Sequence, residues 1–337
     1  MRFYSDNTAT ICPELLEAIR SANQGLEKAY GDDPWTMRLD QVFGEFFARP
    51  VRAYAVATGT AANALALATL SPPYGAIFAH EEAHIARDEC GAPEFFSGGA
   101  RLALVCGAHG KLTANALAGA LDANPVSVHT VQPAAVSLTQ ASELGTVYRP
   151  EEIAAIAAIA HARGLRVHVD GARIANALAF LGCHPSEVTW RAGVDVLSFG
   201  ATKNGALAAE AVVFFDPARA ADFELRRKRA GHLLSKSRFV AAQLIAYLES
   251  GVWLRNATRA NALAQRIARA AGARLLHPTE ANEVFLHLGA DGKARLRSAG
   301  FAFYDWGAEA SGEARFVASW DQPEESVSAL CEALARL

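Results

Sequence analysis

The sequence lacks the features that would place it in several specialised classes of protein. No apolar run reaches the length of a transmembrane helix, since the richest stretch, 206–215, is interrupted by Glu210. Charge of one sign is not in excess: 32 Lys and Arg stand against 35 Asp and Glu, a formal net charge of −3. This balance gives no electrostatic reason to expect nucleic acid or a membrane as partner. G-x-G-x-x-G and G-x-x-x-x-G-K-[ST] are both absent, so the common glycine-rich nucleotide sites are not indicated.

Cysteine is scarce, and its placement is informative. The five cysteines form no C-x-x-C pair and are scattered at Cys12, Cys90, Cys106, Cys183 and Cys331. An odd, dispersed set favours free thiols in a reducing compartment over a disulfide framework. The segment 1–6 turns polar at once and does not show the apolar core of a signal peptide. We therefore expect a cytoplasmic globular protein.

The order of elements predicts an α/β fold with two domains. Short β-branched or apolar runs alternate with alanine-rich helical segments up to about residue 215, which is typical of a mostly parallel sheet covered on both faces. One helix is expected over 13–23 and another over 34–47. After residue 217 the chain becomes basic and helical, and its last part mixes two short strands with helices. We predict a large domain over 1–245 and a small α/β domain over 246–337.

Two of the predicted strands end on a side chain that can carry charge. One strand leads into Asp170, and the next, 194–199, leads through a small-residue turn into Lys203. Ligands of open parallel sheets bind beyond the carboxyl ends of the strands. An amine and a carboxylate delivered there suit pyridoxal phosphate, whose Schiff base needs a lysine and whose ring nitrogen needs an acid. Alternatively, Lys203 is a solvated loop lysine, and Asp170 caps a helix beside Arg173.

Three further segments carry candidate ligand-binding groups. Thr58-Gly59-Thr60 joins a strand to a helix, where free backbone N–H groups suit a phosphate, although an ordinary helix cap has the same sequence. Arg315 lies in a predicted strand, and its guanidinium suits a carboxylate, although half-exposed strand arginines are common. The basic run 226–229 is either a solvated helix face or a phosphate ligand across a subunit contact.

The segment His80-Glu81-Glu82-Ala83-His84 matches the H-E-x-x-H motif of zinc hydrolases. That motif needs both histidines on one helix face, with the glutamate as base. Here residues 76–79 read as a strand, and the prolines before them preclude a long helix, so we expect His80 at a strand end. We therefore predict no metal site and keep a zinc hydrolase as a remote alternative. His84 alone could stack on a planar ring or move a proton.

Taken together, several segments resemble the low-specificity threonine aldolases, a group of fold-type-I pyridoxal phosphate enzymes of the β-eliminating lyase type. The resemblance covers nearly the whole chain, and H-x-D-G-A-R is its most specific motif. The segments are Ser5-Asp6-Asn7-Thr8, Tyr30-Gly31-Asp32-Asp33-Pro34, Gly59-Thr60-Ala61-Ala62-Asn63, Ala83-His84 with Glu89-Cys90-Gly91, and His168-Val169-Asp170-Gly171-Ala172-Arg173.

The resemblance implies a role for each matching residue. Lys203 forms the Schiff base, Asp170 pairs with the ring nitrogen, and His84 stacks on the ring. The remaining implied cofactor ligands are Gly59, Thr60, Arg173 and Arg227. The substrate ligands would be Ser5, Tyr30, Arg173 and Arg315, with Tyr30 reaching across a subunit contact. His129 would be the second active-site histidine, so either His84 or His129 could be the base.

Two departures from the family pattern bear on the substrate. The common E-N-T-H-N stretch is replaced by Thr139-Gln140-Ala141-Ser142-Glu143, and the usual S-K-G-L reads Thr202-Lys203-Asn204-Gly205. The resemblance implies a seven-stranded, mostly parallel sheet and a homotetramer or dimer with the active site near a subunit contact. The expected reaction is cleavage of L-threonine, L-allo-threonine or a related amino acid such as phenylserine to glycine and an aldehyde. Another pyridoxal phosphate lyase on the same fold is the alternative.

Overall fold

A computed structural model describes residues 1–337, with the side chain of Glu309 left out of the description. Its larger part is built on a seven-stranded sheet in the order β1-β7-β6-β5-β4-β2-β3. The strands are β1 (Arg52–Val56), β2 (Gly75–His80), β3 (Arg101–Val105), β4 (Gln132–Thr139), β5 (Arg166–Gly171), β6 (Val196–Gly200) and β7 (Glu210–Phe214). Only β7 runs antiparallel to its neighbours among these strands. The predicted mostly parallel seven-stranded sheet is confirmed.

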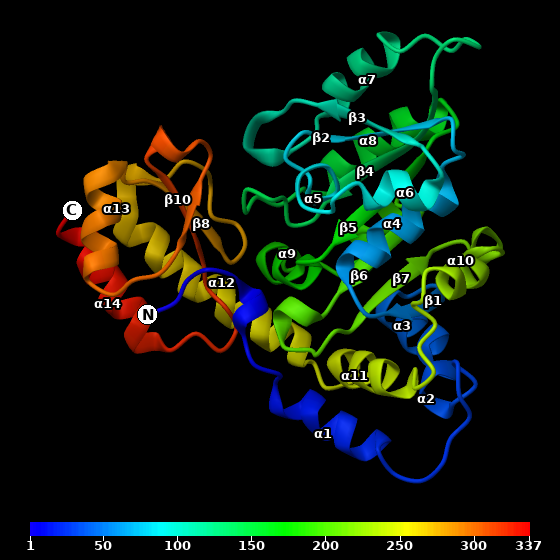
Figure 1. Ribbon diagram of the computed structural model, residues 1–337, viewed down its shortest axis with the longest axis horizontal. Helices are drawn as coiled ribbons and strands as arrows, with labels where there is room; N and C mark the ends of the chain where they lie inside the picture. Colours follow the sequence, from blue (N-terminus) through cyan, green and yellow to red (C-terminus); the bar gives the residue numbers. More distant parts are fainter.

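Helices cover both faces of this sheet (Figure 1). The longer ones are α1 (Pro13–Ala22), α3 (Leu39–Phe47), α4 (Gly59–Leu70), α7 (Ala114–Asp122), α8 (Pro150–Ala162), α9 (Ile174–Leu181) and α11 (Arg238–Glu249). Short helices are α2 (Pro34–Met37), α5 (His84–Arg87), α6 (Ala92–Ser97) and α10 (Phe223–Arg229). The single helix predicted over 34–47 is wrong, because α2 ends in a tight turn at Arg38 before α3 begins.

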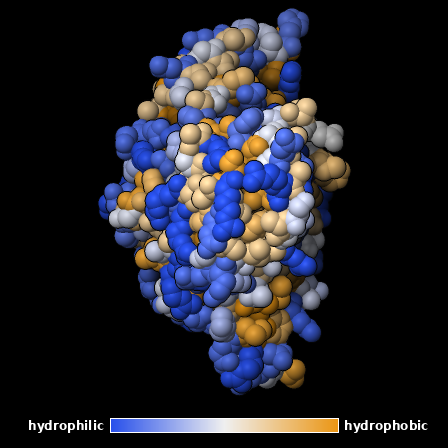
Figure 2. All heavy atoms as spheres, turned by 90° about the vertical axis from the view of Figure 1, so that its left-hand side faces the viewer, coloured by the Kyte–Doolittle hydropathy of each residue, from blue (hydrophilic) through white to orange (hydrophobic). Residues whose placement is uncertain are grey.

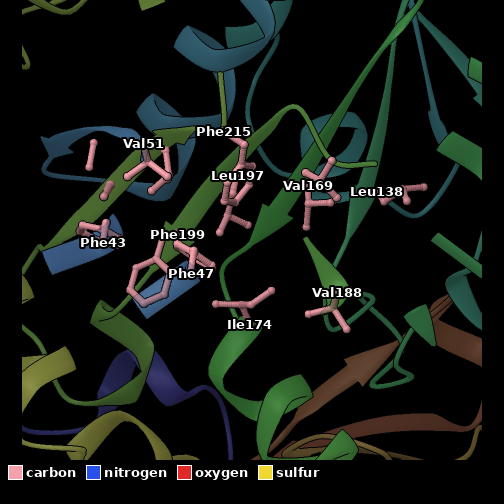
Figure 3. Packing of buried hydrophobic residues seen from close by; sticks show 14 of the residues in the cluster. Phe43, Phe47, Val51, Leu138, Val169, Ile174, Val188, Leu197, Phe199 and Phe215 are labelled. Atoms are coloured by element: carbon pink, nitrogen blue, oxygen red, sulfur yellow. The ribbon is translucent and has the colours of Figure 1, made fainter. Parts of the chain in front are cut away.

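Strand residues alternate between two cores, as the period of a β-strand requires. Val213 of β7 belongs to the core under α3, whereas Val212 and Phe214 pack with α4 on the opposite face. In the first core, the ring of Phe43 meets that of Phe199 edge-on at 5.2 Å between centroids (Figure 3). The central strands are thus buried on both faces, which holds their carboxyl ends rigidly in place.

The C-terminal part carries a second, antiparallel sheet in the order β8-β10-β9. Its elements are α12 (Val252–Ala271), β8 (Glu283–His287), α13 (Gly289–Ser298), β9 (Tyr304–Trp306), β10 (Glu313–Val317) and α14 (Glu324–Ala335). They enclose a core of their own, which the N-terminal Phe3 joins. The backbone of Phe3 bonds to Ala302 at 2.7 Å and to Val317 at 3.0 Å. The boundary at residue 245 stays a prediction.

The surface on the side of the smaller sheet mixes hydrophilic and apolar residues (Figure 2). The long helix α12 is amphipathic: Leu263 and Ile267 are buried, while Arg255 and Arg259 face outward in ion pairs with Glu14 and Glu324. None of the helices in the described part of the chain combines the length and apolar character needed to cross a membrane.

Candidate active site

The candidate site lies at the carboxyl ends of β5 and β6. Asp170 is the penultimate residue of β5, and Lys203 follows β6 in a short 3-10 turn over Thr202–Asn204. Both side chains line one cavity of about 480 Å³, to which His84 and the start of α4 also contribute. A volume of this size is typical of small-molecule sites. The structure thus brings the amine and the carboxylate together at the edge where ligands of such sheets bind.

Buried polar side chains form a hydrogen-bond network around Asp170. The Asn63 amide donates to Asp170 Oδ2 and to Glu89 Oε1, both at 2.8 Å. The same Glu89 oxygen lies 2.8 Å from His84 Nδ1, and the Ala172 N–H donates to Asp170 Oδ1 at 3.0 Å. These contacts fix the carboxylate of Asp170 and the ring of His84 relative to each other.

The protonation states of Glu89 and His84 in this hydrogen-bond network depend on each other. Burial raises the pKa of Glu89, against the hydrogen bonds from His84 and Asn63. The hydrogen bond to Glu89 in turn raises the pKa of His84, and burial opposes that effect. His84 is therefore biased towards its protonated form, in which neither ring nitrogen can accept a proton.

The N-terminus of α4 forms another wall of the cavity. Thr58 is the N-cap, and its Oγ1 accepts the Ala61 N–H at 3.2 Å. Thr58, Gly59 and Thr60 all line the cavity. The first N–H groups of a helix have no intrahelical partner and carry the positive end of its dipole. This wall of the cavity therefore suits an anion such as a phosphate.

Arg173 is held by carboxylates of the chain itself. Its Nε and Nη2 donate to Asp6 at 2.8 and 3.0 Å, and its Nη1 lies 3.2 Å from Glu283. Burial would raise the pKa of Asp6, but the charges of Arg173 and Lys203 and the hydrogen bonds from Arg173 and Asn282 together outweigh it and lower that pKa to about 2. Burial raises the pKa of Glu283 to about 7, against the attraction of Arg173 and Arg315. The sequence did not reveal these two carboxylates.

Ser5 and Arg315 lie beside this cluster. Ser5 Oγ accepts the Asn7 N–H at 3.1 Å, and Asn7 lines the cavity of Lys203. Arg315 of β10 lies over the ring of Trp306 at 5.2 Å, and its Nη1 is 4.0 Å from Glu283. Its buried Nε has no hydrogen-bond partner among the described groups, so this guanidinium can still take an acceptor.

Two more buried glutamates face the same region and were missed in the sequence. Glu210 lines the cavity and accepts the Ala201 N–H at 3.2 Å, and burial raises its pKa to about 7. Glu143 follows β4, and the charges of Lys203 and Arg173 act on it. Glu210 is surrounded by apolar sequence, and only the departure from E-N-T-H-N could have drawn attention to Glu143.

Tyr30 and Arg227 lie apart from the cavity of Lys203 within one chain. They line a different cavity of about 380 Å³, together with Arg52 and Tyr54. Tyr30 is 52% exposed, with Lys228 Nζ 4.4 Å from its ring centroid. Arg227 Nε donates to the His232 carbonyl at 3.3 Å. The roles expected for both residues therefore depend on a second copy of the chain.

His129 also lies away from the cluster. It is exposed in the loop before β4, and its N–H donates to Ser127 Oγ at 3.2 Å. Thr139, at the other end of β4, pairs with Asp170. The seven steps between the eight strand residues, at about 3.3 Å each, separate the two ends by roughly 23 Å. Within one chain His129 therefore lies at the edge of the sheet opposite Asp170, and its role as the second active-site histidine stays a prediction.

The H-E-x-x-H match does not form a helical metal motif. His80 ends β2, and His84 begins α5, as the sequence indicated. His80 Nε2 contacts the Gly107 carbonyl at 2.9 Å, and its Nδ1 accepts the Glu82 N–H at 3.0 Å. Both ring nitrogens of His80 are thus engaged with the backbone, which removes the zinc hydrolase reading.

Comparisons with known proteins agree on one group. The family model described as β-eliminating lyase matches residues 2–291. The chain is 46% identical over 333 residues to a low specificity L-threonine aldolase of Pseudomonas aeruginosa, covering 98% of this chain and 95% of that protein. A structure of Leishmania major threonine aldolase matches with a TM-score of 0.93 at 26% identity, over 99% and 98% of the two chains. Sphingomonas wittichii serine palmitoyltransferase shares the fold, with a TM-score of 0.72 at 15% identity over 100% of this chain and 86% of the other.

Proposed function

The chain belongs to the β-eliminating lyase family, and from that premise we propose that it is a pyridoxal phosphate-dependent aldolase. It cleaves L-threonine, L-allo-threonine and related L-β-hydroxy-α-amino acids to glycine and an aldehyde. The observation that carries the proposal is one cavity lined by Lys203, Asp170, His84 and the start of α4. Relatives of nearly full length named low specificity L-threonine aldolase support the same reaction.

The residues of the cavity fit pyridoxal phosphate. Lys203 would bind it through the amine, Asp170 would face the ring nitrogen, and His84 would cover the ring. Gly59 and Thr60 would hold the phosphate at the start of α4. Buried Asn63 and Glu89 each keep an oxygen without a hydrogen-bond partner among the described groups. These two oxygens can still accept hydrogen bonds from a bound molecule. When bound, the cofactor supplies a ring that accepts the electron pair of the broken bond.

The chain's own residues select which substrate bond lies over that ring. Arg315, with Arg173 and Ser5 beside it, would hold the substrate carboxylate. Glu283 lies between the two guanidinium groups, and its pKa of about 7 allows it to become neutral when an anion approaches. Asp6 keeps Arg173 in place throughout.

The proposal extends to the assembly and the compartment. Tyr30 and Arg227 would complete the site of a neighbouring copy, which calls for a homotetramer or a dimer. The free cysteines agree with a cytoplasmic location. Size-exclusion chromatography with light scattering tests the assembly: a monomer that cleaves threonine at full rate would contradict it.

Product analysis tests the reaction itself. The protein loaded with pyridoxal phosphate is mixed with L-threonine or L-phenylserine, and glycine and aldehyde are quantified by chromatography. Equal amounts of glycine and the matching aldehyde are expected. Formation of ammonia and a 2-oxo acid, without glycine, would instead identify another lyase of the same fold.

A further inference from the structure

The proposed function gives no task to two buried glutamates of this region, Glu210 and Glu143. Glu210 already accepts the Ala201 N–H. Glu143 lies in the turn after β4, where Ser142 N–H donates to the Thr146 carbonyl at 2.8 Å. The hydroxyls of Ser142 and Thr146 are 2.7 Å apart, and each also donates to the His109 carbonyl. Gly145 allows the turn through its φ of +75°. The backbone that carries Glu143 is therefore fixed.

Glu143 lies close to the reacting groups, because it follows the last residue of β4 by four positions and that residue, Thr139, pairs with Asp170. The charges of Lys203, Arg173 and His84 attract its carboxylate, and Asp170 and the nearby Glu283 repel it. It is 9% exposed, and no hydrogen bond joins it to any described side chain. Burial raises the pKa of Glu143, against the attraction of Lys203, Arg173 and His84. A carboxyl group with a raised pKa beside these charges is suited to take up and release a proton.

Glu143 also opens onto a second cavity of about 690 Å³. Its lining combines the apolar side chains of Leu144 and Trp306 with charged ones such as Arg87 and Asp305. Glu143 thus lines the second cavity, while the charges of Lys203, His84 and Asp170, which line the first, act on it. The second cavity has room for an aldehyde fragment larger than acetaldehyde.

His84 is the other candidate for the proton transfer, but its ring is already engaged. Its Nδ1 is bonded to Glu89, and its pKa is raised by that bond. We infer that Glu143, rather than His84, is the catalytic acid–base residue for the β-hydroxyl of the substrate, with the second cavity as the binding site of the aldehyde part. This inference rests on the proposed aldolase function.

The step balances as follows. Glu143 takes the proton of the β-hydroxyl, and the electron pair of that O–H bond forms the carbonyl of the aldehyde. The Cα–Cβ bond breaks, and its electron pair stays with the glycine fragment, which takes up one proton at Cα. The proton on Glu143 returns to solvent, so threonine gives glycine and acetaldehyde without oxidant or reductant.

The test compares two reactions of the holoenzyme, of which only the first needs the transfer of a β-hydroxyl proton. One is aldehyde release from L-threonine; the other is exchange of the α-hydrogen of glycine with deuterated water, followed by NMR. The variants are Glu143→Gln, which keeps the shape but holds no exchangeable carboxyl proton, and Glu143→Asp. Glu151→Gln is the control for the loss of one carboxylate, since Glu151 is exposed on α8 and lines neither cavity.

We expect Glu143→Gln to lose about 100-fold or more in aldehyde release and to keep glycine exchange within about threefold. Glu143→Asp should recover part of the loss, and Glu151→Gln should match the wild type in both reactions. Unchanged aldehyde release in Glu143→Gln, or an equal loss of both reactions, would overturn the inference. Absence of aldehyde release in the wild type would instead overturn the proposed function.

Two measurements keep the inference testable if Glu143→Gln does not fold. In the wild type, the rate of aldehyde release should fall as the pH drops through the raised pKa of Glu143. The rate of glycine exchange should not show this decrease. In cofactor-free protein, infrared absorbance of protonated carboxyl groups should contain a component titrating above pH 4.5, the ordinary glutamate value, that Glu143→Asp displaces. An acid limb common to both reactions, or an identical infrared titration, would contradict the assignment.

Discussion

The contribution of the Asp6–Arg173 ion pair to the free energy of unfolding can be predicted in magnitude. The pair is buried, with the two residues 2% and 5% exposed, and it joins the N-terminal segment to the end of β5. Lowering the pKa of Asp6 from 3.8 to about 2 corresponds to roughly 2.4 kcal/mol. Removing one member of a buried pair leaves the other charge uncompensated, at about 3–5 kcal/mol. We expect Asp6→Asn to lower the free energy of unfolding by about 2–5 kcal/mol at pH 7.

The pH dependence of this loss has a definite sign. The folded state favours the Asp6 carboxylate, so its contribution is complete above the unfolded pKa near 3.8 and is lost as the pH falls towards 2. The pH-dependent part of the difference between wild type and Asp6→Asn should shrink from roughly 2.4 kcal/mol at pH 7 to roughly 1.3 kcal/mol at pH 3.

Urea unfolding of the cofactor-free protein, followed by tryptophan fluorescence at pH 7 and pH 3, measures this difference. Exposed Asp291→Asn controls for the loss of one negative charge and should change stability by about 1 kcal/mol or less. A variant Asp6→Asn as stable as the wild type at pH 7, or a difference independent of pH, would refute the reasoning.

Two further changes separate chemistry from folding. Asp170→Ala should lower aldehyde release by about 100-fold or more and cost about 1–3 kcal/mol of stability through the unpaired Asn63 amide; an unaffected rate would remove Asp170 from the mechanism. Thr58→Ala and Thr113→Ala each delete one helix N-cap and should each cost about 1 kcal/mol in urea unfolding. Only Thr58→Ala should also weaken pyridoxal phosphate affinity, measured by absorbance titration, and equal affinities would exclude the start of α4 from cofactor binding.

Strands and helices could be predicted from the sequence where their residue patterns were long enough to recognise. The strands leading to Asp170 and Lys203 are rich in apolar and β-branched residues and are bounded by small residues, so their positions and their common edge could be predicted. Strand β9 has only three residues and includes Asp305, too few to show a period of two. The break between α2 and α3 at Arg38 carries neither glycine nor proline, so no local signal marked it.

Local sequence patterns could not predict the polar network, because its residues come from distant parts of the chain. Asp6 is 167 positions from Arg173, and Asn63 is 107 positions from Asp170. Only the folded sheet brings these pairs together, so a resemblance in motif could assign Arg173 to a substrate without revealing the carboxylates that hold it. His129 precedes β4 and therefore lies at the amino end of that strand, away from Asp170 within one chain.

The most direct test of the central claim is a titration of the pyridoxal phosphate-loaded protein with L-threonine, in the wild type and in Lys203→Ala. Cofactor absorbance and acetaldehyde are recorded together. In the wild type, the absorbance band should shift on addition of threonine while acetaldehyde accumulates. Lys203→Ala should show neither covalent attachment of the cofactor nor acetaldehyde. Acetaldehyde release at the wild-type rate by Lys203→Ala would contradict the account.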